Sequence, residues 1–414
     1  MVDLANPAVH WLKIFNRVAT GSLAILLSSC ASLKAPRTLF ITYSIDEVDF
    51  RAETTQIRSF LNKYTEAFQR SNPDVNVVFI NYKSKNLYDQ IARDSSLNLG
   101  PDLIITQQFA APELLARDLI TTLPSQQDFD AIYSQRIQSR AKTKAGYLFA
   151  PWLISTQIAC FNKAKIKDPP STMQELEELS ASGKRFGLAT NPFELFWTAG
   201  TQGAISEFSS LGRGIATNQA YPGIQVWLQW LQRAALYKNI SFNENYRELS
   251  FKLKNNELDW ITCWGGIELE DLKKTMGNKL GVAALPNGRS SKAFPTQVFY
   301  GFSLGENSSQ SQRTMALKFI RSNVNTIAQR KIQLDDLGFL ATNQNVSILP
   351  KNSQIQSAIN TSYNEQRQSY SKEELGIKSY GERYGDQSKT LADLIDGSLD
   401  VDEALKILTT PETN

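Results

Sequence analysis

The sequence predicts an α/β fold built on a mainly parallel sheet. Between residues 38 and 105, strand-like and helix-like patterns alternate in the order βαβαβ, which is typical of parallel strands joined by crossover helices. Residues 102–105 form a short, almost wholly apolar run, as expected for a strand that helices cover on both faces. With 414 residues, the chain is long enough for two or three domains with cores of their own.

The spacing of apolar residues predicts the first five elements. Residues 38–44 alternate as a strand, and apolar side chains between Ile57 and Phe68 recur at helical spacing until Asn72-Pro73 ends the helix. The strand period returns at 75–79, a second helix covers 87–94, and the buried strand 102–105 follows. In open sheets of this kind, ligands contact the loops after the carboxyl ends of the strands.

The rest of the chain mixes strands with a largely helical carboxyl third. Thr172 and Glu175 have the spacing of a capping box, which predicts a helix that begins at Met173. Helical or strand periodicity assigns Trp227, Trp230 and Trp260 to the core. The remaining predicted strands cover residues 147–161, 186–190, 258–263, 280–285 and 295–304, and the helices cover 173–179, 224–237, 314–324, 327–334 and 391–408.

The charge balance and the scarcity of histidine exclude several functions. The chain has 44 Lys and Arg against 41 Asp and Glu, without a run of like charge, so we expect no nucleic-acid partner. Its single histidine, His10, precedes an apolar stretch that we expect to be removed. A mature chain without histidine cannot form a Ser-His-Asp triad or a His-ligated zinc or iron site. Many classes of enzyme are therefore excluded, and we expect no metal and no cofactor.

The amino terminus has the features of an export signal. Lys13 and Arg17 precede an apolar core at 18–27, which is shorter than the roughly 20 residues needed to span a bilayer. The small residues before Cys30 resemble the lipobox of bacterial lipoproteins, in which the cysteine is lipidated and becomes the first mature residue. Residues 1–29 are then the signal peptide and 30–37 a tether. The alternatives are a plain secretory signal or a short membrane anchor.

Two further cysteines, Cys160 and Cys263, lie in apolar segments that are predicted to be buried strands. We expect them to be small core residues. An exported compartment would also permit a disulfide between them if the two strands are neighbours.

Short motifs recur along the chain in a fixed order. Phe68-Gln69-Arg70-Ser71-Asn72-Pro73-Asp74-Val75 leads from a helix to a strand, Gly100-Pro101-Asp102-Leu103-Ile104 opens a strand, and Pro169-Pro170-Ser171-Thr172-Met173-Gln174-Glu175-Leu176 opens a helix. Further motifs are Pro151-Trp152, Phe161-Asn162-Lys163, residues 260–266, residues 282–286, Ala316-Leu317-Lys318-Phe319-Ile320 and Gly338-Phe339-Leu340-Ala341. In this order they resemble the extracellular solute-binding proteins of bacterial ABC importers, in the sugar-type family 1. Met173 stands where tryptophan is usual in that family, and Leu340 where proline is usual.

The resemblance implies a periplasmic-binding-protein-like clamp of two α/β lobes that close by hinge motion on a solute in the cleft between them. Crossings between lobes are implied near 149–153, 263–266 and 305–311. The first lobe would comprise residues 38–150 and 265–308, and the second 151–264 and 309–414. The closed form would dock on the permease subunits of the transporter, and a lipid on Cys30 would hold the protein at the outer face of the cell membrane.

Carbohydrate sites combine aromatic platforms with carboxylates and amides. The resemblance places four aromatic residues near the cleft, although each of them could instead be core: Trp152, Trp197, Trp264 and Tyr300. Gly265 would allow the backbone to approach the ligand, or would simply form a turn. The polar candidates, for which a solvated loop is the alternative, follow strands or precede Trp197: Ser44, Asp46, Glu47, Gln107, Gln108 and Glu194.

These observations predict a substrate-binding lipoprotein of an ABC importer that captures a sugar, an oligosaccharide or a glucosylated compatible solute. One alternative keeps the clamp but binds ferric iron through tyrosinates, or another small charged solute. A second alternative is a secreted glycan-acting enzyme, in which Glu47 would face Glu194 or Glu268 across a cleft. A clamp that signals to a membrane sensor would have the same sequence features.

Overall fold

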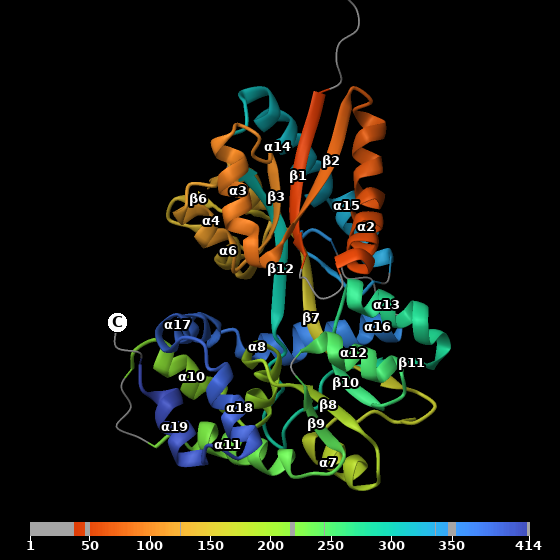
Figure 1. Ribbon diagram of the computed structural model, residues 1–414, viewed down its shortest axis with the longest axis vertical. Helices are drawn as coiled ribbons and strands as arrows, with labels where there is room; N and C mark the ends of the chain where they lie inside the picture. The colour runs from red at the N-terminus through yellow and green to blue at the C-terminus, as the bar shows by residue number, and fades with distance from the viewer. Residues whose placement is uncertain are drawn as a thin grey trace, which may run out of the picture.

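The computed structural model describes residues 37–45, 50–124, 126–215, 220–243, 245–335, 337–346 and 353–411. The predicted signal peptide, Cys30, residues 30–36 of the tether, Asp46 and Glu47 lie outside these ranges. The described residues form two α/β lobes, one above the other, joined by two long strands (Figure 1). The predicted fold class is therefore confirmed.

The first lobe contains the predicted βαβαβ pattern. Strand β1 pairs in parallel with β2 on one side and with β3 on the other. Helix α2 is amphipathic, and Phe60, Leu61, Tyr64 and Phe68 lie on its buried face. The elements of this lobe before the first crossing are β1 (Arg37–Ile45), α2 (Phe50–Ser71), β2 (Val75–Lys83), η2 (Ser84–Asn86), α3 (Leu87–Ser96), β3 (Leu103–Gln107), α4 (Ala111–Ala116), β4 (Ile120–Thr121), α5 (Gln126–Ile132), α6 (Gln135–Ala141), β5 (Lys142–Thr143) and β6 (Gly146–Tyr147).

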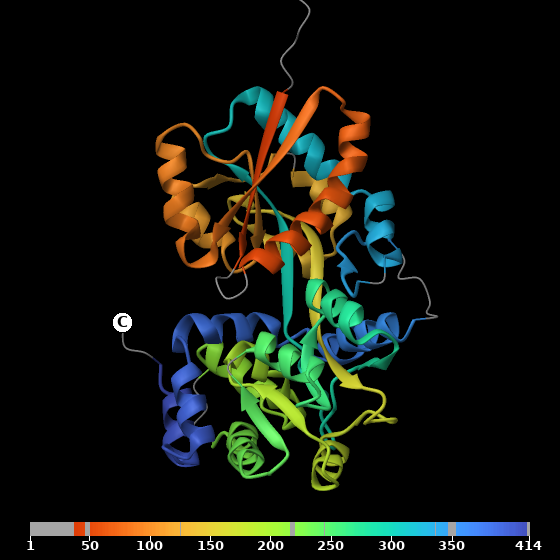
Figure 2. The ribbon, with the colours of Figure 1, turned by 45° about the vertical axis from the view of Figure 1, so that its right-hand side comes forward.

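Strands β7 (Ala150–Asn162) and β12 (Gln297–Gly305) pass between the lobes (Figure 2). They pair with each other in antiparallel fashion, and β12 also pairs with β3 of the first lobe. The lower part of β7 pairs with strands of the second lobe instead. Because β7 pairs with strands of both lobes and β12 runs beside it, the region between the lobes forms a hinge of two strands.

The second lobe has a smaller sheet whose order continues from β7 through β10 and β8 to β9. Helix α7 begins with the predicted capping box, in which Thr172 accepts from the backbone N–H of Glu175 and the Glu175 carboxylate accepts from Thr172. The elements between the crossing strands are α7 (Met173–Ala181), β8 (Phe186–Ala189), α8 (Pro192–Leu195), α9 (Trp197–Thr201), α10 (Ile205–Gly212), α11 (Pro222–Ala235), β9 (Ile240–Asn243), α12 (Tyr246–Lys254), β10 (Trp260–Trp264), α13 (Ile267–Met276), η3 (Gly277–Lys279) and β11 (Leu280–Ala283).

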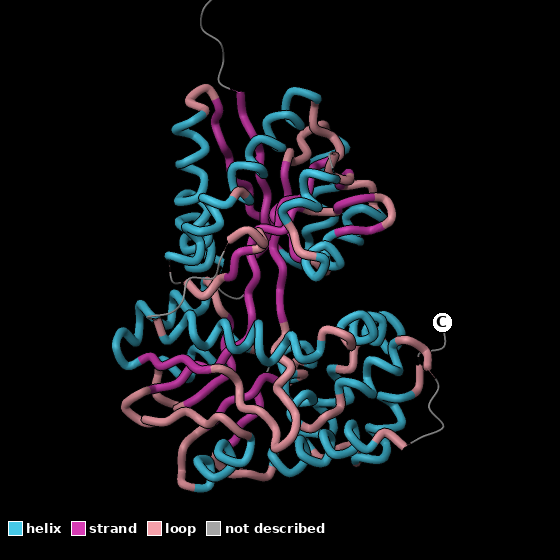
Figure 3. Tube along the Cα trace, turned by 180° about the vertical axis from the view of Figure 1, so that it is seen from behind, coloured by secondary structure: helices cyan, strands magenta, loops and turns pink. Residues whose placement is uncertain are grey.

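The carboxyl third is shared between the lobes. Helices α14 (Gln310–Val324) and α15 (Thr326–Leu334) and strand β13 (Leu340–Ala341) complete the first lobe. The chain then returns to the second lobe in a run of helices, part of which crosses the hinge strands on the side that faces the viewer in Figure 3. That run comprises α16 (Gln354–Asn360), η4 (Thr361–Arg367), η5 (Gln368–Tyr370), α17 (Glu374–Tyr384), α18 (Ser388–Asp396) and α19 (Val401–Thr409).

Two of the expected lobe boundaries differ from the structure. Residues 265–308 were expected in the first lobe, but α13 contacts α12 and β10, and β11 pairs with β7 in the second lobe. Residues 309–414 were expected in the second lobe, but α14 packs on the first, where Phe319 meets Phe68 of α2 at 5.1 Å between ring centroids. The crossing therefore falls at β12 rather than near 263–266, because α13 buries its apolar face against second-lobe elements.

The cysteines differ from the expected pair of free core residues. Cys160 on β7 and Cys263 on β10 form a disulfide with a Cα–Cα distance of 5.8 Å. Their strands are antiparallel neighbours, which brings the two sulfur atoms together. Trp227, Trp230 and Trp260 are buried in the second-lobe core, as the sequence predicts. Among the described residues, no helix is long and apolar enough to cross a membrane.

Candidate functional site

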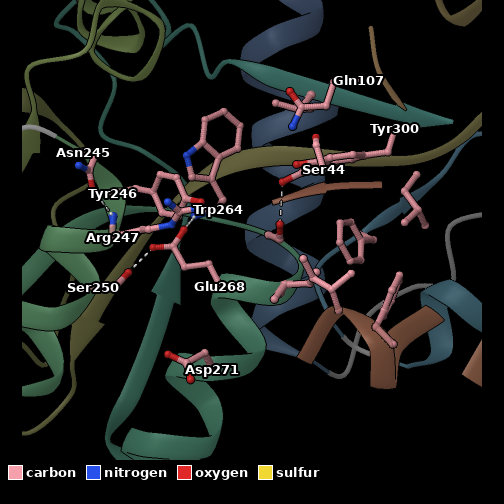
Figure 4. A pocket seen from close by; sticks show the side chains of 18 of the residues that line it. Ser44, Gln107, Asn245, Tyr246, Arg247, Ser250, Trp264, Glu268, Asp271 and Tyr300 are labelled. Atoms are coloured by element: carbon pink, nitrogen blue, oxygen red, sulfur yellow. Dashed lines mark hydrogen bonds between the residues drawn. The ribbon is translucent and has the colours of Figure 1, made fainter. Parts of the chain in front are cut away.

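A cavity of about 830 Å³ lies between the two lobes, in front of the hinge strands (Figure 4). The ends of β1 and β3 and helix α2 form its first-lobe wall. Helices α8, α12 and α13 and the end of β10 form its second-lobe wall. Because the two walls belong to different lobes, a change in the angle between the lobes changes the width of the cavity.

The first-lobe wall presents polar side chains at strand ends and apolar ones from α2. Ser44 is at the carboxyl end of β1 and Gln107 at that of β3, and these parallel strands end at the same edge of the sheet. Ile57 and Phe60 of α2 add an apolar surface beside them. This wall therefore offers hydrogen-bonding groups next to an apolar face.

The hinge strands form the floor of the cavity. Trp152 on β7 is 2% exposed and packs against Phe60 at 5.7 Å and Phe302 at 4.9 Å between ring centroids. It belongs to the first-lobe core and also lines the cavity. Half-buried Tyr300 on β12 also lines the cavity, with its ring 6.5 Å from that of Phe339 between centroids. Ser155 on β7 donates to the carbonyl of Gly265 at 2.6 Å, which ties the hinge to the end of β10.

The second-lobe wall carries a pair of stacked aromatic rings. Phe193 of α8 stacks on Trp264 at 5.7 Å between centroids, with 8° between the ring planes. Phe109, which follows β3 in the first lobe, contacts the edge of Phe193 at 5.3 Å. An aromatic surface is thus available to an apolar sugar face, and one of its rings already contacts the opposite lobe.

Helix α12 supplies the charged part of the same wall. The side chain of Asn245 caps this helix by accepting from the backbone N–H groups of Arg247 and Glu248. The helix was not among the predicted elements, although an Asn followed by Leu249 and Leu253 at helical spacing is a detectable signal. Its cavity residues, and Asp271 of α13, were missed together with it: Tyr246, Arg247, Glu248, Ser250, Lys254 and Asp271. Glu268 of α13 also lines the cavity and was named from the sequence only for the alternative of a glycan-acting enzyme.

Two carboxyl groups of this wall titrate far from their ordinary range. Burial raises the pKa of Glu268 to about 8, although its carboxylate accepts hydrogen bonds from Ser250 and from the backbone N–H of Trp264. Burial likewise raises the pKa of Glu194 to about 7, against the effects of a backbone hydrogen bond from Tyr246 and the charge of Arg247. Perturbed carboxyl groups in a cleft are a common feature of binding sites.

The predicted site residues divide into three groups. Those that line the cavity are Ser44, Gln107, Trp152, Glu194, Trp264, Gly265 and Tyr300. Gln108 points elsewhere and donates to the carbonyl of Gln297 at 3.3 Å. Trp197 does not line the cavity, contrary to the prediction. It is fully buried in the second-lobe core, with its ring 6.4 Å from that of Trp260. Asp46 and Glu47 lie outside the described residues.

The sequence did not single out Phe193, although it directly precedes Glu194 and follows the Asn191-Pro192 turn. Among the described residues, no group of three His, Cys, Asp or Glu side chains is placed to hold a metal ion. The lining offers aromatic faces, carboxylates and amides around the space between the lobes.

Solved structures share this fold. The GacH receptor of Streptomyces glaucescens, solved unliganded and in complex with acarbose, aligns with a TM-score of 0.67 at 14% identity over 90% of this chain and 97% of the receptor. The maltose-binding protein MalE of Listeria monocytogenes, in complex with maltose, aligns with a TM-score of 0.63 at 15% identity over 91% of this chain and 98% of its own. A search of curated proteins gives no match.

A comparison of the amino-acid sequence with protein families shows to which family the chain belongs. Residues 51–321 match the family described as bacterial extracellular solute-binding protein, a range that runs from α2 through both crossing strands and into α14. That range includes the cavity and the hinge. The two-lobe fold, the cavity between the lobes and this match agree, and the chain belongs to the family of bacterial extracellular solute-binding proteins.

Proposed function

We propose that this protein is the substrate-binding component of an ABC importer and captures a sugar, an oligosaccharide or a glucosylated compatible solute outside the cytoplasm. The observation that carries the proposal is the composition of the cavity. Stacked Phe193 and Trp264 face a polar wall that includes Ser44 and Gln107 on the other lobe. An aromatic platform opposite hydrogen-bonding groups suits a ring with apolar faces and a rim of hydroxyls.

The division of the cavity between lobes supports a clamp mechanism. A solute that contacts both walls at once binds the closed form better than the open form, and this difference in affinity shifts the population toward closure. Among the described residues, β7 and β12 are the segments at which the angle between the lobes would change. The permease subunits would then recognise the closed pair of lobes and accept the solute.

The proposal that the protein is a lipid-anchored lipoprotein rests on its amino-terminal sequence. Cys30 would carry the lipid, and the segment up to residue 37 would tether the lobes to the outer face of the cell membrane. Labelling of cells with a radioactive or clickable fatty acid tests this directly, because a Cys30→Ala chain should remain unlabelled.

Similar structures support a carbohydrate. They include proteins solved in complex with maltotetraose, maltose and α-D-tagatose. Their identity to this chain is low, between 13% and 15% for these three, so the choice of sugar rests on experiment.

The test is thermal unfolding of the domain that begins after Cys30, against maltose, larger maltodextrins, tagatose, glucosylglycerol, ferric citrate and spermidine. A ligand at 100 times its Kd adds about 2.7 kcal/mol of stability, which raises Tm by roughly 2–4 °C in a protein of this size. Trp264→Ala should abolish the shift. Tyr237→Ala, at a partly exposed tyrosine just after helix α11, is the matched control and should keep it.

The outcomes separate the alternatives. A shift with ferric citrate or spermidine, and with no sugar, would keep the clamp and refute the carbohydrate proposal. Release of new reducing ends from maltodextrins during incubation would instead indicate a glycan-acting enzyme.

A further inference from the structure

One carboxylate oxygen in the cavity lacks a partner. Glu194 is 8% exposed and lines the cavity, and its Oε2 atom forms no hydrogen bond. A buried carboxylate oxygen without a donor is energetically costly, and the large majority of buried polar side-chain atoms in folded proteins have a hydrogen-bond partner. The cavity is the direction from which a donor can come.

Contacts with neighbouring elements hold Glu194 in position. Asn191 caps helix α8 by accepting from the backbone N–H of Phe193 at 2.9 Å. Gln157, on the hinge strand β7, donates to the backbone carbonyl of Glu194 at 2.8 Å. The backbone of Tyr246 hydrogen-bonds the carboxylate. These contacts hold the unpaired oxygen in place before any solute arrives.

A second carboxylate lies close enough to interact with it. Glu268 accepts from Ser250 and from the backbone N–H of Trp264, both of them uncharged donors. The charge of Glu194 contributes to the raised pKa of Glu268, as does that of Asp271. Two neighbouring carboxyl groups with uncharged donors thus lie beside the stacked rings, and a cation bound there would favour the ionised form of both.

The other acidic groups of this wall have basic partners. Asp271 pairs with Lys254 at 2.8 Å, and Glu248 pairs with Lys252 at 2.7 Å. Arg247 lies near enough to Glu194 to lower the pKa of that carboxyl group. Asp271 and Glu248 thus have lysine partners, whereas, within the described residues, neither Glu194 nor Glu268 forms a salt bridge with a basic side chain.

We propose that the cavity selects a sugar that carries a protonated amine, with the unpaired oxygen of Glu194 as its acceptor and Glu268 as the second carboxylate. This inference rests on the proposed function and names the class of sugar. One ammonium group supplies the donor that the Oε2 atom of Glu194 lacks, and its positive charge favours the ionised form of that carboxyl group. The adjacent rings of Phe193 and Trp264 favour the same group, because a cation over an aromatic face is stabilised.

The test compares sugars that differ at one nitrogen. Glucosamine, N-acetylglucosamine and glucose, and the dimers of glucosamine and of glucose, are titrated into the domain after Cys30 at about pH 7, where the amine is largely protonated. We expect each free amine to bind about tenfold or more tightly than its neutral counterpart, the effect of one charge-assisted hydrogen bond.

The variant Glu194→Gln keeps the shape of the side chain and removes its charge. It should reduce the preference for the amine to within about twofold, and the Tm of the empty protein should stay level or rise, because an unpaired buried charge is lost. The control is Glu113→Gln, on the far surface of the first lobe, where the carboxylate pairs with Arg117; it should keep the preference.

Two results would overturn the inference. If neutral sugars bind as tightly as the amines, or if Glu194→Gln retains the preference, the amine selectivity is wrong while the sugar-binding function stands. If no sugar of either kind binds, the proposed function fails, and the inference fails with it.

Discussion

The carboxyl group of Glu268 has a consequence for stability at the residue scale. Its pKa of about 8 in the folded protein is above the value of roughly 4.3 in an unfolded chain. Between these values the folded state holds a proton that the unfolded state has released, so stability falls as pH rises through this window. Glu194, with a pKa of about 7, acts in the same direction.

We therefore expect the empty protein to lose stability, on the order of 1–3 kcal/mol, as the pH rises from about 5 to about 8. Glu268→Gln should remove much of this pH dependence, because glutamine does not titrate. Chemical unfolding at a series of pH values measures it. A variant that keeps the full pH dependence of the parent protein would show that Glu268 is not its source.

At Gly265, the addition of a single methyl group should lower the stability of the fold. A Cβ atom there would lie 2.2 Å from the carbonyl oxygen of Gly338, which is backbone and cannot rotate away. Gly265→Ala should cost about 1–3 kcal/mol of unfolding free energy. Gly381→Ala in helix α17, where a Cβ would meet nothing within 4 Å, should instead gain about 0.5–1 kcal/mol. Equal stabilities for the two variants would contradict the predicted contact.

At the scale of elements, the disulfide joins hinge strand β7 to β10 of the second lobe. It connects residues 103 positions apart, and a bond that closes so long a loop removes much conformational entropy from the unfolded chain. Reduction should lower the unfolding free energy by about 2–5 kcal/mol. Cys160→Ser should show the lower value both with and without reductant.

Thiol labelling of the unfolded protein without reductant provides the control for this prediction. Cys160 and Cys263 should both resist labelling until a reductant is added. Labelling of both residues without it would show that they are free, as the sequence had favoured.

At the scale of the whole molecule, one carboxylate connects the lobes. Arg136 and Arg140 of α6 in the first lobe reach Glu374 of α17 in the second, at 2.9 and 2.8 Å. Arg367 of η4 binds the same carboxylate at 2.9 Å. Although burial opposes it, the three arginines lower the pKa of Glu374 to about 2.

Glu374→Gln should therefore cost about 3–5 kcal/mol, because it leaves buried arginines without their counter-charge. Stability from this cluster is present above the unfolded pKa of roughly 4.3 and is lost as the pH falls toward about 2. Thermal unfolding between these pH values should show the loss in the parent protein and a weaker one in the variant. Glu365→Gln, at an exposed site on η4, should behave like the parent; a Glu374→Gln protein of unchanged stability would refute the role of the cluster.

The sequence was most informative where structure is encoded locally. The capping box at Thr172 and Glu175, the apolar stripe of α2 and the strands of the first sheet depend on residues within a few positions of one another. Helix α12 was also encoded locally, by the cap at Asn245, but its weaker apolar pattern was not recognised. Because this helix was not predicted, most of the charged residues of the cavity wall were not predicted either.

The sequence by itself determined the α/β class, the order of the elements in the first βαβαβ segment and, through the order of its motifs, the family. Only the tertiary structure decided that α14 belongs to the first lobe, that Cys160 and Cys263 are bonded, that Trp197 is core and that Phe193 stacks on Trp264. The physical reason is the distance along the chain over which each kind of interaction acts. Periodicity and caps act over a turn or a strand, whereas the partner of a side chain is set by packing between segments far apart in the chain.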